Sequence, residues 1–379
     1  MTKKDMMELR RRFTKEDCTF TKMVGCYVNS EKEKILSFSE NFLNLEKSEF
    51  NKYLDIAKKT TGGKIGNNLL KLGFKTQEKI EESSQRLLLG IRDSGLKDKE
   101  LLNCLYDLII ENYDYSGNYL ILLYHDVYDV IAKTSDNIKM DDSSELYEYV
   151  ICSICPVELS KPGLGYIKEE NRIGNRIRDW VVKAPDNGFI YPVFNDRSSD
   201  INSIMYFTRN IKSPKTKFME NGLGCISKLT NEEEKVSFQN ILKDTLGKEN
   251  DVIINDINNR LKDITEFEEP IELDNTLLKD VLVESKVPEE FIPKIEADYT
   301  HFFKENLPIA DSVLDKKIIK KAQEKQVDEI LEAKKNSTVF ININEGLGRE
   351  IKKDIVEGKE CLIIPLDEDS EIKINGKEM

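Results

Sequence analysis

The chain has 379 residues, 39% of them hydrophobic, and a formal net charge of −13. This length and composition are typical of a folded protein with two domains or with one large domain and an appendage. The acidity argues against a protein that coats DNA through bulk charge. The apolar runs are too short for a transmembrane helix, and the charged N-terminus lacks the apolar segment of a signal peptide. Seven scattered cysteines favour reduced thiols. We therefore expect a cytoplasmic protein that has no membrane partner.

The first third of the chain alternates between helical and extended patterns. Helices are expected at residues 3–13, 46–59, 75–91 and 97–111, and a β-hairpin is expected with strands at 19–28 and 34–43. The Gly-rich segment 60–66 suggests a nucleotide-binding loop, but it fails the P-loop pattern because Lys64 is followed by Ile rather than Ser or Thr. This segment is therefore interpreted as a flexible basic loop.

Two runs rich in apolar and β-branched residues, at 119–128 and 146–157, are predicted to be central strands covered on both faces. His125 lies on the first run, where a lone histidine is more often a hydrogen-bonded core residue than a catalyst. Cys152 and Cys155 have CxxC spacing, but on a strand they would lie on opposite faces. Buried structural thiols are therefore favoured over a metal or redox pair.

The stretch from 161 to 225 contains the only tryptophan and is predicted to carry the site. Strands are expected at 188–194 and 204–207. Segment 171–182 has partly helical spacing, which would place Arg172 and Arg176 on one side of a helix. The inner face of that helix would be formed by Ile173, Ile177, Trp180 and Val181. An alternative role for the arginines is to pair with Glu169 and Glu170 and so hold the helix on the sheet.

Residues 161–228 form a local basic island, with twelve Lys and Arg residues against seven Asp and Glu residues. Arginine forks bind phosphate or carboxylate groups, and short basic loops often contact phosphate backbones. The candidate nucleic-acid-binding residues are Arg172, Arg176, Arg178, Arg197, Lys212, Lys215 and Lys217. The alternative is an ordinary solvated surface.

A polar turn at 195–200 supports a second hypothesis, a phosphate-handling metal-dependent hydrolase. Asp196 and Asp200 would hold an ion there, and neighbouring arginines, including Arg197, would clamp the anion. Two acids in one loop also arise from turn formation alone, without any catalytic role. We therefore assign no catalytic residue, no metal ligand and no cofactor.

From about residue 229 the composition shifts to Lys and Glu at helical spacing. Helices are expected at 232–246, 252–261, 277–283, 289–304 and 313–335, followed by short strands at 337–344, 361–365 and 371–375. The sequence thus predicts an α+β protein with three parts. These are a mixed domain of helices and antiparallel sheet at 1–228, a helical region at 229–335 and a small β-module at 336–379.

The strings that carry a resemblance to a known family are the N-terminal run MTKKDMMELRRRFTKEDCTFTKMVGCYV, CPVELSKPGLGY, ENRIGNRIRDWVV, GFIYPVFNDRSSDI and NGLGC. They resemble a family of uncharacterised Firmicute proteins that is defined only as a domain of unknown function. The resemblance covers nearly the whole chain, and it implies no function.

A more distant resemblance is to the bacterial nucleoid-associated protein family. It rests on the order of elements, on Tyr124 and His125 at the end of a hydrophobic strand, on the strings MYF and FMENGLG within 204–225, and on the final IKING hairpin. The segment NRIGNRIRDWVV at 171–182 has no counterpart in that pattern. The resemblance implies association with DNA and no catalytic residues.

Together these observations favour a non-enzymatic protein that binds nucleic acid or a nucleoprotein through the basic island. The hydrolase is one alternative. Another is a protein scaffold in which the acidic helical region docks a basic protein partner. An oligomer is compatible with each hypothesis.

Overall fold

A computed structural model describes residues 1–75, 83–133, 139–195, 198–247, 250–266, 270–304, 306–322, 324, 352–357, 359–363, 373–374 and 377–378. The chain forms two compact units, Met1–Leu314 and Asp315–Met379. None of the helices in the described ranges combines the length and the apolar character that crossing a bilayer requires.

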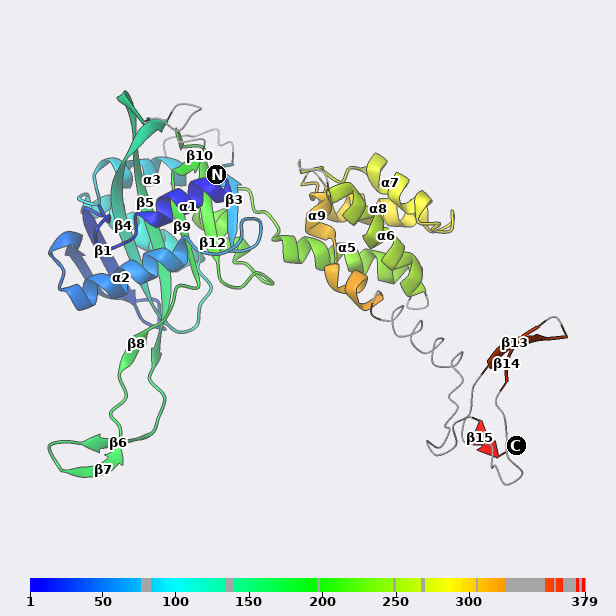
Figure 1. Ribbon diagram of the computed structural model, residues 1–379. Helices are drawn as coiled ribbons and strands as arrows, with labels where there is room; N and C mark the ends of the chain where they lie inside the picture. The colour runs from blue at the N-terminus through cyan, green and yellow to red at the C-terminus, as the bar shows by residue number, and fades with distance from the viewer. Residues whose placement is uncertain are drawn as a thin grey trace. The chain divides into compact units, whose positions relative to one another are not determined.

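An eight-stranded antiparallel sheet is the centre of the first unit (Figure 1). Its strands are β1 (Lys22–Val28), β2 (Lys34–Glu40), β3 (Leu69–Gly73), β4 (Asn118–Lys133), β5 (Lys139–Leu159), β8 (Trp180–Val182), β9 (Asn187–Tyr191) and β12 (Ser203–Thr208). The order across the sheet is β2-β1-β4-β5-β9-β12-β3, and β8 also pairs with β5. The predicted central strands are therefore confirmed as β4 and β5.

Helices cover both faces of the sheet. One face carries α1 (Lys3–Arg11), the 3-10 turn η1 (Phe42–Asn44) and α2 (Lys47–Thr60), and the other carries α3 (Ser84–Asp93), α4 (Lys99–Asn112) and the π-helical turn η3 (Phe218–Gly222). Along β4, Ile121 and Leu123 enter one core and Leu122 and Tyr124 the other. This strict alternation explains why residues 119–124 of β4 are apolar or aromatic at every position. We call this three-layer structure, without β8, the sheet body.

Two elements differ from the sequence-based expectation. Residues 171–182 are not a helix: β7 (Arg172–Asn175) pairs with β6 (Leu164–Ile167), and the chain then returns to the sheet through β8. Ile173 and Val181 are β-branched and Gly174 is a poor helix former, so cross-strand pairing prevails over helical spacing. The sequence predicted no strand at the position of β3. A small hairpin of β10 (Val193–Asn195) and β11 (Ser198–Asp200) accounts for the polar turn.

The remaining elements follow the expected order. The helices are α5 (Asn231–Leu246), α6 (Asp251–Thr265), α7 (Asn275–Glu284), α8 (Ile292–Phe303) and α9 (Ala310–Val313). In the second unit, β13 (Lys352–Val356) pairs with β14 (Lys359–Ile363), and β15 (Lys373–Ile374) pairs with β16 (Lys377–Glu378). The α+β class is confirmed. The strand predicted at 337–344 and much of the helix predicted at 313–335 lie outside the described residues.

Candidate nucleic-acid interface

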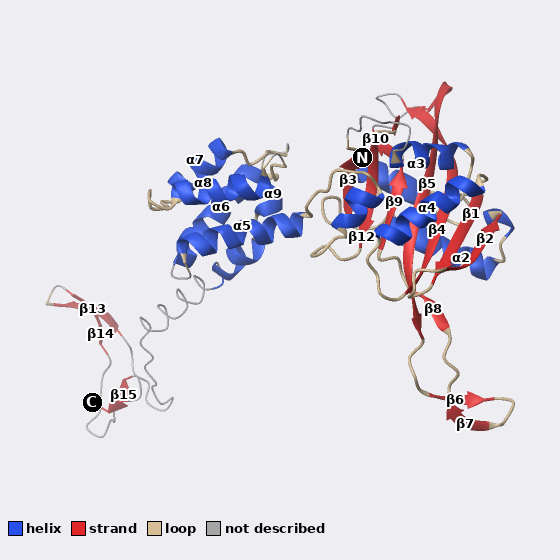
Figure 2. Cartoon of the chain, turned by 180° about the vertical axis from the view of Figure 1, so that it is seen from behind, coloured by secondary structure: helices blue, strands red, loops and turns tan. Residues whose placement is uncertain are grey.

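The most prominent feature of the first unit is a β-ribbon, residues 160–183, which we call the arm. It is the distal part of a long hairpin: β5 leaves the sheet, and the chain returns through β8 and β9, both of which pair with β5. At its root the Ser160 amide donates to the Asp179 carbonyl (2.8 Å), and the Asp179 amide donates to the Ser160 hydroxyl oxygen (3.1 Å). Figure 2 shows β6 and β7 extending away from the sheet body.

The strand register gives the outer arm two different faces. Leu164 lies opposite Asn175 and Tyr166 lies opposite Ile173, so these four side chains share one face. The other face carries the Gly165–Gly174 pair together with Ile167 and Arg172. We call them the apolar face and the guanidinium face.

The glycine pair makes room for the arginine side chains. A Cβ atom at Gly174 would lie 2.6 Å from Nη1 of Arg172, and a Cβ atom at Gly165 would lie 3.6 Å from Cβ of Arg176. Arg172 and Arg176 therefore lie over the two glycines on the same side of the ribbon. Arg172 is also ion-paired with Glu170, and both side chains are more than half exposed.

The other predicted residues fall into two groups. Arg178 lies at the root of the arm, where its Nε donates to the Ser160 carbonyl (2.8 Å). Lys212, Lys215 and Lys217 lie in the loop after β12, where Lys215 Nζ donates to the Asp114 carbonyl (2.6 Å) and Lys217 Nζ is 3.4 Å from the Asp114 carboxylate. Arg197 lies outside the described residues.

The register shows that the arm and this basic loop leave the same end of the sheet. Thr208, the last residue of β12, pairs with Asn187, the first residue of β9, which follows the arm. At the same end, Val157 of β5 pairs with both Asn118 and Val182. Most of the predicted basic residues are thus brought to one end of the sheet body.

Sequence reasoning missed the exposure of the arm's apolar side chains. The residues assigned to the inner face of a helix are exposed instead: Ile173 at 64%, Ile177 at 82%, Trp180 at 57% and Val181 at 40%. Leu164 and Tyr166 are also exposed, at 74% and 61%. The signal that could have revealed this arrangement is the pair of short alternating runs on either side of the polar turn at 168–171.

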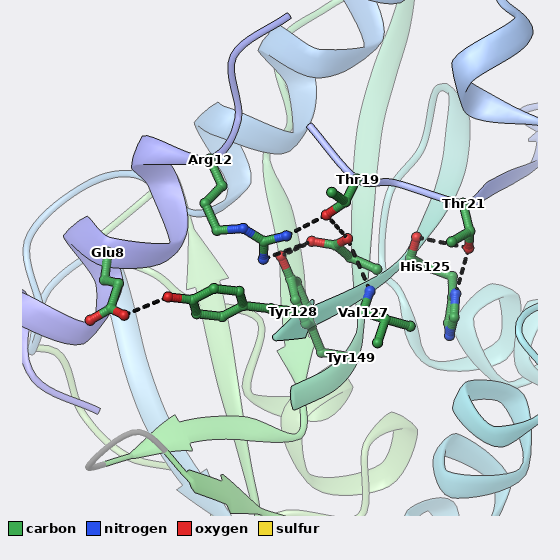
Figure 3. Close-up of polar contacts among 9 residues, drawn as sticks. Glu8, Arg12, Thr19, Thr21, His125, Val127, Tyr128 and Tyr149 are labelled. Carbon is green, nitrogen blue, oxygen red and sulfur yellow. Dashed lines mark hydrogen bonds and ion pairs between the residues drawn. The ribbon is translucent and has the colours of Figure 1, made fainter. Parts of the chain in front are cut away.

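A second concentration of polar side chains lies inside the sheet body, around Asp126 (Figure 3). The Asp126 carboxylate accepts hydrogen bonds from the hydroxyls of Thr19 and Tyr149 (both 2.6 Å) and from the Val127 amide (2.9 Å). Arg12 completes the set, with Nη1 3.3 Å from Asp126 and the guanidinium carbon 4.0 Å from the centre of the Tyr128 ring. These partners satisfy the buried Asp126 carboxylate and join Arg12 and Thr19 to strand β4.

His125 belongs to the same strand and is equally well satisfied. The side chain is buried, with Nδ1 2.7 Å from the Thr21 hydroxyl and Nε2 2.8 Å from the Glu148 carboxylate. The two CxxC cysteines lie in different cores, Cys152 on one face of the sheet and Cys155 on the other, as the strand period predicts. Burial raises the pKa of both thiols.

The loop proposed for a hydrolase is only partly described. Asp196 lies outside the described residues, whereas Asp200 is ion-paired with Lys71 (2.8 Å). Burial acts to raise the pKa of Asp200, but hydrogen bonds from Lys71 and Ser203 outweigh it and lower that pKa. No group of three or more His, Cys, Asp or Glu side chains suited to a metal ion occurs in the part of the chain that the structure describes.

A comparison with curated proteins found no match to the chain. The family model described as "Domain of unknown function (DUF4317)" matches residues 1–376, so its match includes both the sheet body and the arm. The chain therefore belongs to the DUF4317 family.

Proposed function

We propose that this protein is a non-enzymatic nucleic-acid-binding protein that uses its arm as the principal contact. The observation that carries the proposal is the placement of Arg172 and Arg176 on one face of a projecting two-stranded ribbon. Such a ribbon fits the major groove of a duplex, and guanidinium groups suit phosphate oxygens and guanine edges.

The spacing of the two arginines suits contacts with different phosphates. Residues four apart in an extended chain lie about 13 Å apart, whereas phosphates along one strand recur about every 3.4 Å of helix axis. The ion pair between Arg172 and Glu170 is exposed, so it contributes little stability and can exchange for a phosphate contact. Both arginines are therefore available to a polyanion.

The end of the sheet body supplies a second set of contacts. Lys212 is exposed in the loop after β12, and Lys215 and Lys217 lie in the same loop beside Asp114. A nucleic acid held by the arm would extend past this loop, because both leave the same end of the sheet. The loop would add sequence-independent affinity.

The test is binding of nuclease-treated protein to labelled double-stranded DNA, single-stranded DNA and structured RNA across a salt series. We expect Arg172→Gln/Arg176→Gln to lower affinity at low salt and to reduce the slope of log K against log [salt] by about two, since each lost phosphate contact removes roughly 0.9 from the slope for a duplex. Arg260→Gln/Lys262→Gln in α6 makes the same charge change away from the arm and is the matched control.

Two results would refute the proposal. One is the absence of binding by the wild-type protein to all three polymers at low salt, where electrostatic attraction is strongest. The other is an equal loss of affinity in the arm variant and in the α6 control, which would mean that net charge alone governs binding.

A further inference from the structure

The apolar face of the arm has no role in phosphate binding. Leu164, Tyr166 and Ile173 point away from the guanidinium face, and each is more than 60% exposed. Ile177, which is 82% exposed, follows Ile173 and Asn175 at the same alternation and continues this face toward the root of the arm. Exposed apolar side chains that occur singly are normal, but a contiguous set indicates an interaction site.

We propose that the apolar face of the arm binds the same face of a second copy of this chain, so that two arms pack against each other about a two-fold axis. The inference does not depend on the proposed nucleic-acid function, because it uses different side chains of the ribbon. A two-fold interface requires a self-complementary surface, and a flat pair of strands with neutral side chains meets this requirement.

Charge favours a second copy as the occupant. The outer part of the apolar face consists of Leu164, Asn175, Tyr166 and Ile173, and none of them is a Lys, Arg, Asp or Glu. Packing two such faces together brings no like charges into contact, and it leaves Arg172 of each copy on the outer side of the pair. An acidic partner would instead be drawn to the guanidinium face.

The available area fits a weak, transient dimer. The exposed apolar side chains of this face are Leu164, Tyr166, Ile173 and Ile177, with exposures between 61% and 82%. Each offers on the order of 100 Å², so two arms would bury about 800 Å² in total. That area is typical of a transient contact, so we expect self-association with a Kd of about 100 μM.

The experiment is sedimentation equilibrium of the nuclease-treated full-length chain between about 1 and 100 μM. We expect a concentration-dependent dimer for the wild type, and self-association at least tenfold weaker for Leu164→Ser/Ile173→Ser. Both positions are exposed, so circular dichroism should show the variant folded. Val236→Ser/Val252→Ser removes two exposed apolar side chains from α5 and α6 and should dimerise as the wild type does.

A second measurement reports the geometry. In a Cys104→Ser/Cys361→Ser background, Tyr166→Cys places a thiol on the apolar face, and a short bismaleimide should cross-link two copies through it. Glu170→Cys, at the turn, should cross-link less than the Tyr166 variant.

The proposal is overturned if the wild type stays monomeric throughout the range or if the arm variant dimerises undiminished. A monomeric wild type that co-sediments with phosphatidylcholine vesicles would assign the apolar face to a lipid surface instead. Because nucleic acid is absent from these measurements, their failure and a failure of nucleic-acid binding are distinguishable.

Discussion

The sheet body and the arm are both built from antiparallel β-strands, but the sheet body buries most of its side chains and the arm exposes them. In the sheet body, β9 and β12 are buried at every position, and the buried Asp126 carboxylate accepts hydrogen bonds from Thr19 and Tyr149. In the arm, β8 is exposed at every position, and the β6–β7 hairpin exposes apolar and charged residues alike. Substitutions should therefore affect folding in one region and association in the other.

The contrast teaches that a residue's environment, rather than its type, decides its contribution. Arg12 and Arg172 both pair with a carboxylate, but the Asp126 side chain is 2% exposed and that of Glu170 is 54% exposed. The buried pair stabilises its strand through a hydrogen-bonded network, whereas the exposed pair contributes almost nothing to folding.

The largest difference in the free energy of unfolding is expected between the variants that remove the carboxylates of Asp126 and Glu170. Asp126→Ala would leave the Arg12 guanidinium and the hydroxyls of Thr19 and Tyr149 without their acceptor, so the free energy of unfolding should fall by about 3–4 kcal/mol. Glu170→Ala should change it by less than about 0.5 kcal/mol. Urea denaturation measures both values. Equal effects would contradict the division between body and arm.

A pair of glycine substitutions gives a smaller difference. A Cβ atom at Gly188 in β9 would collide with the Cys152 carbonyl oxygen and lie 2.6 Å from Cγ2 of Thr60, whereas one at Gly163 in the arm would meet nothing within 4 Å. We expect Gly188→Ala to cost about 2–3 kcal/mol through overpacking, and Gly163→Ala to be nearly neutral. Thermal unfolding followed by circular dichroism would measure both, and a stable Gly188→Ala would show that β9 can shift.

The smallest expected effect is on the reactivity of cysteine thiols, which can be measured without changing the stability of the protein. Burial raises the pKa of Cys18 to about 11, so at pH 8 only about one molecule in a thousand carries the reactive thiolate there. In the native protein a disulfide reagent should label the exposed Cys104 within minutes and the buried cysteines slowly. A cysteine introduced at the tip of the arm by Glu169→Cys should react at the rate of Cys104. Raising the pH toward 11 should accelerate Cys18, because its thiolate fraction increases.

Much of the sheet body could be predicted from the sequence because its patterns are unambiguous. Strands β4 and β5 contain long runs of apolar and aromatic residues, and the hairpin of β1 and β2 is marked by a polar turn at 29–33. Strand β3 was missed because five residues beside a Gly-rich loop give too short a pattern.

The arm could not be predicted correctly, for a physical reason. A spacing of four residues places Arg172 and Arg176 on one side of a helix. Because four is an even number, the same spacing also places them on one side of a strand. The expectation that they share one side was therefore right, although the predicted helix was wrong. The expectation that Ile173 and Trp180 pack inward was wrong because their neighbours lie in the same ribbon, with no core beneath. The contact of Lys215 with Asp114 spans 101 residues, beyond any local pattern.

The root of the arm has a consequence for how this protein can vary. Ser160 and Asp179 are joined by hydrogen bonds between neighbouring strands, so the eighteen residues between them form the distal end of a hairpin. Its length can change, or a two-residue turn can replace it, without altering the register of β5 with β9. Binding properties can thus diversify in a segment that is decoupled from folding, because the sheet body tolerates changes there that it would not tolerate in its strands.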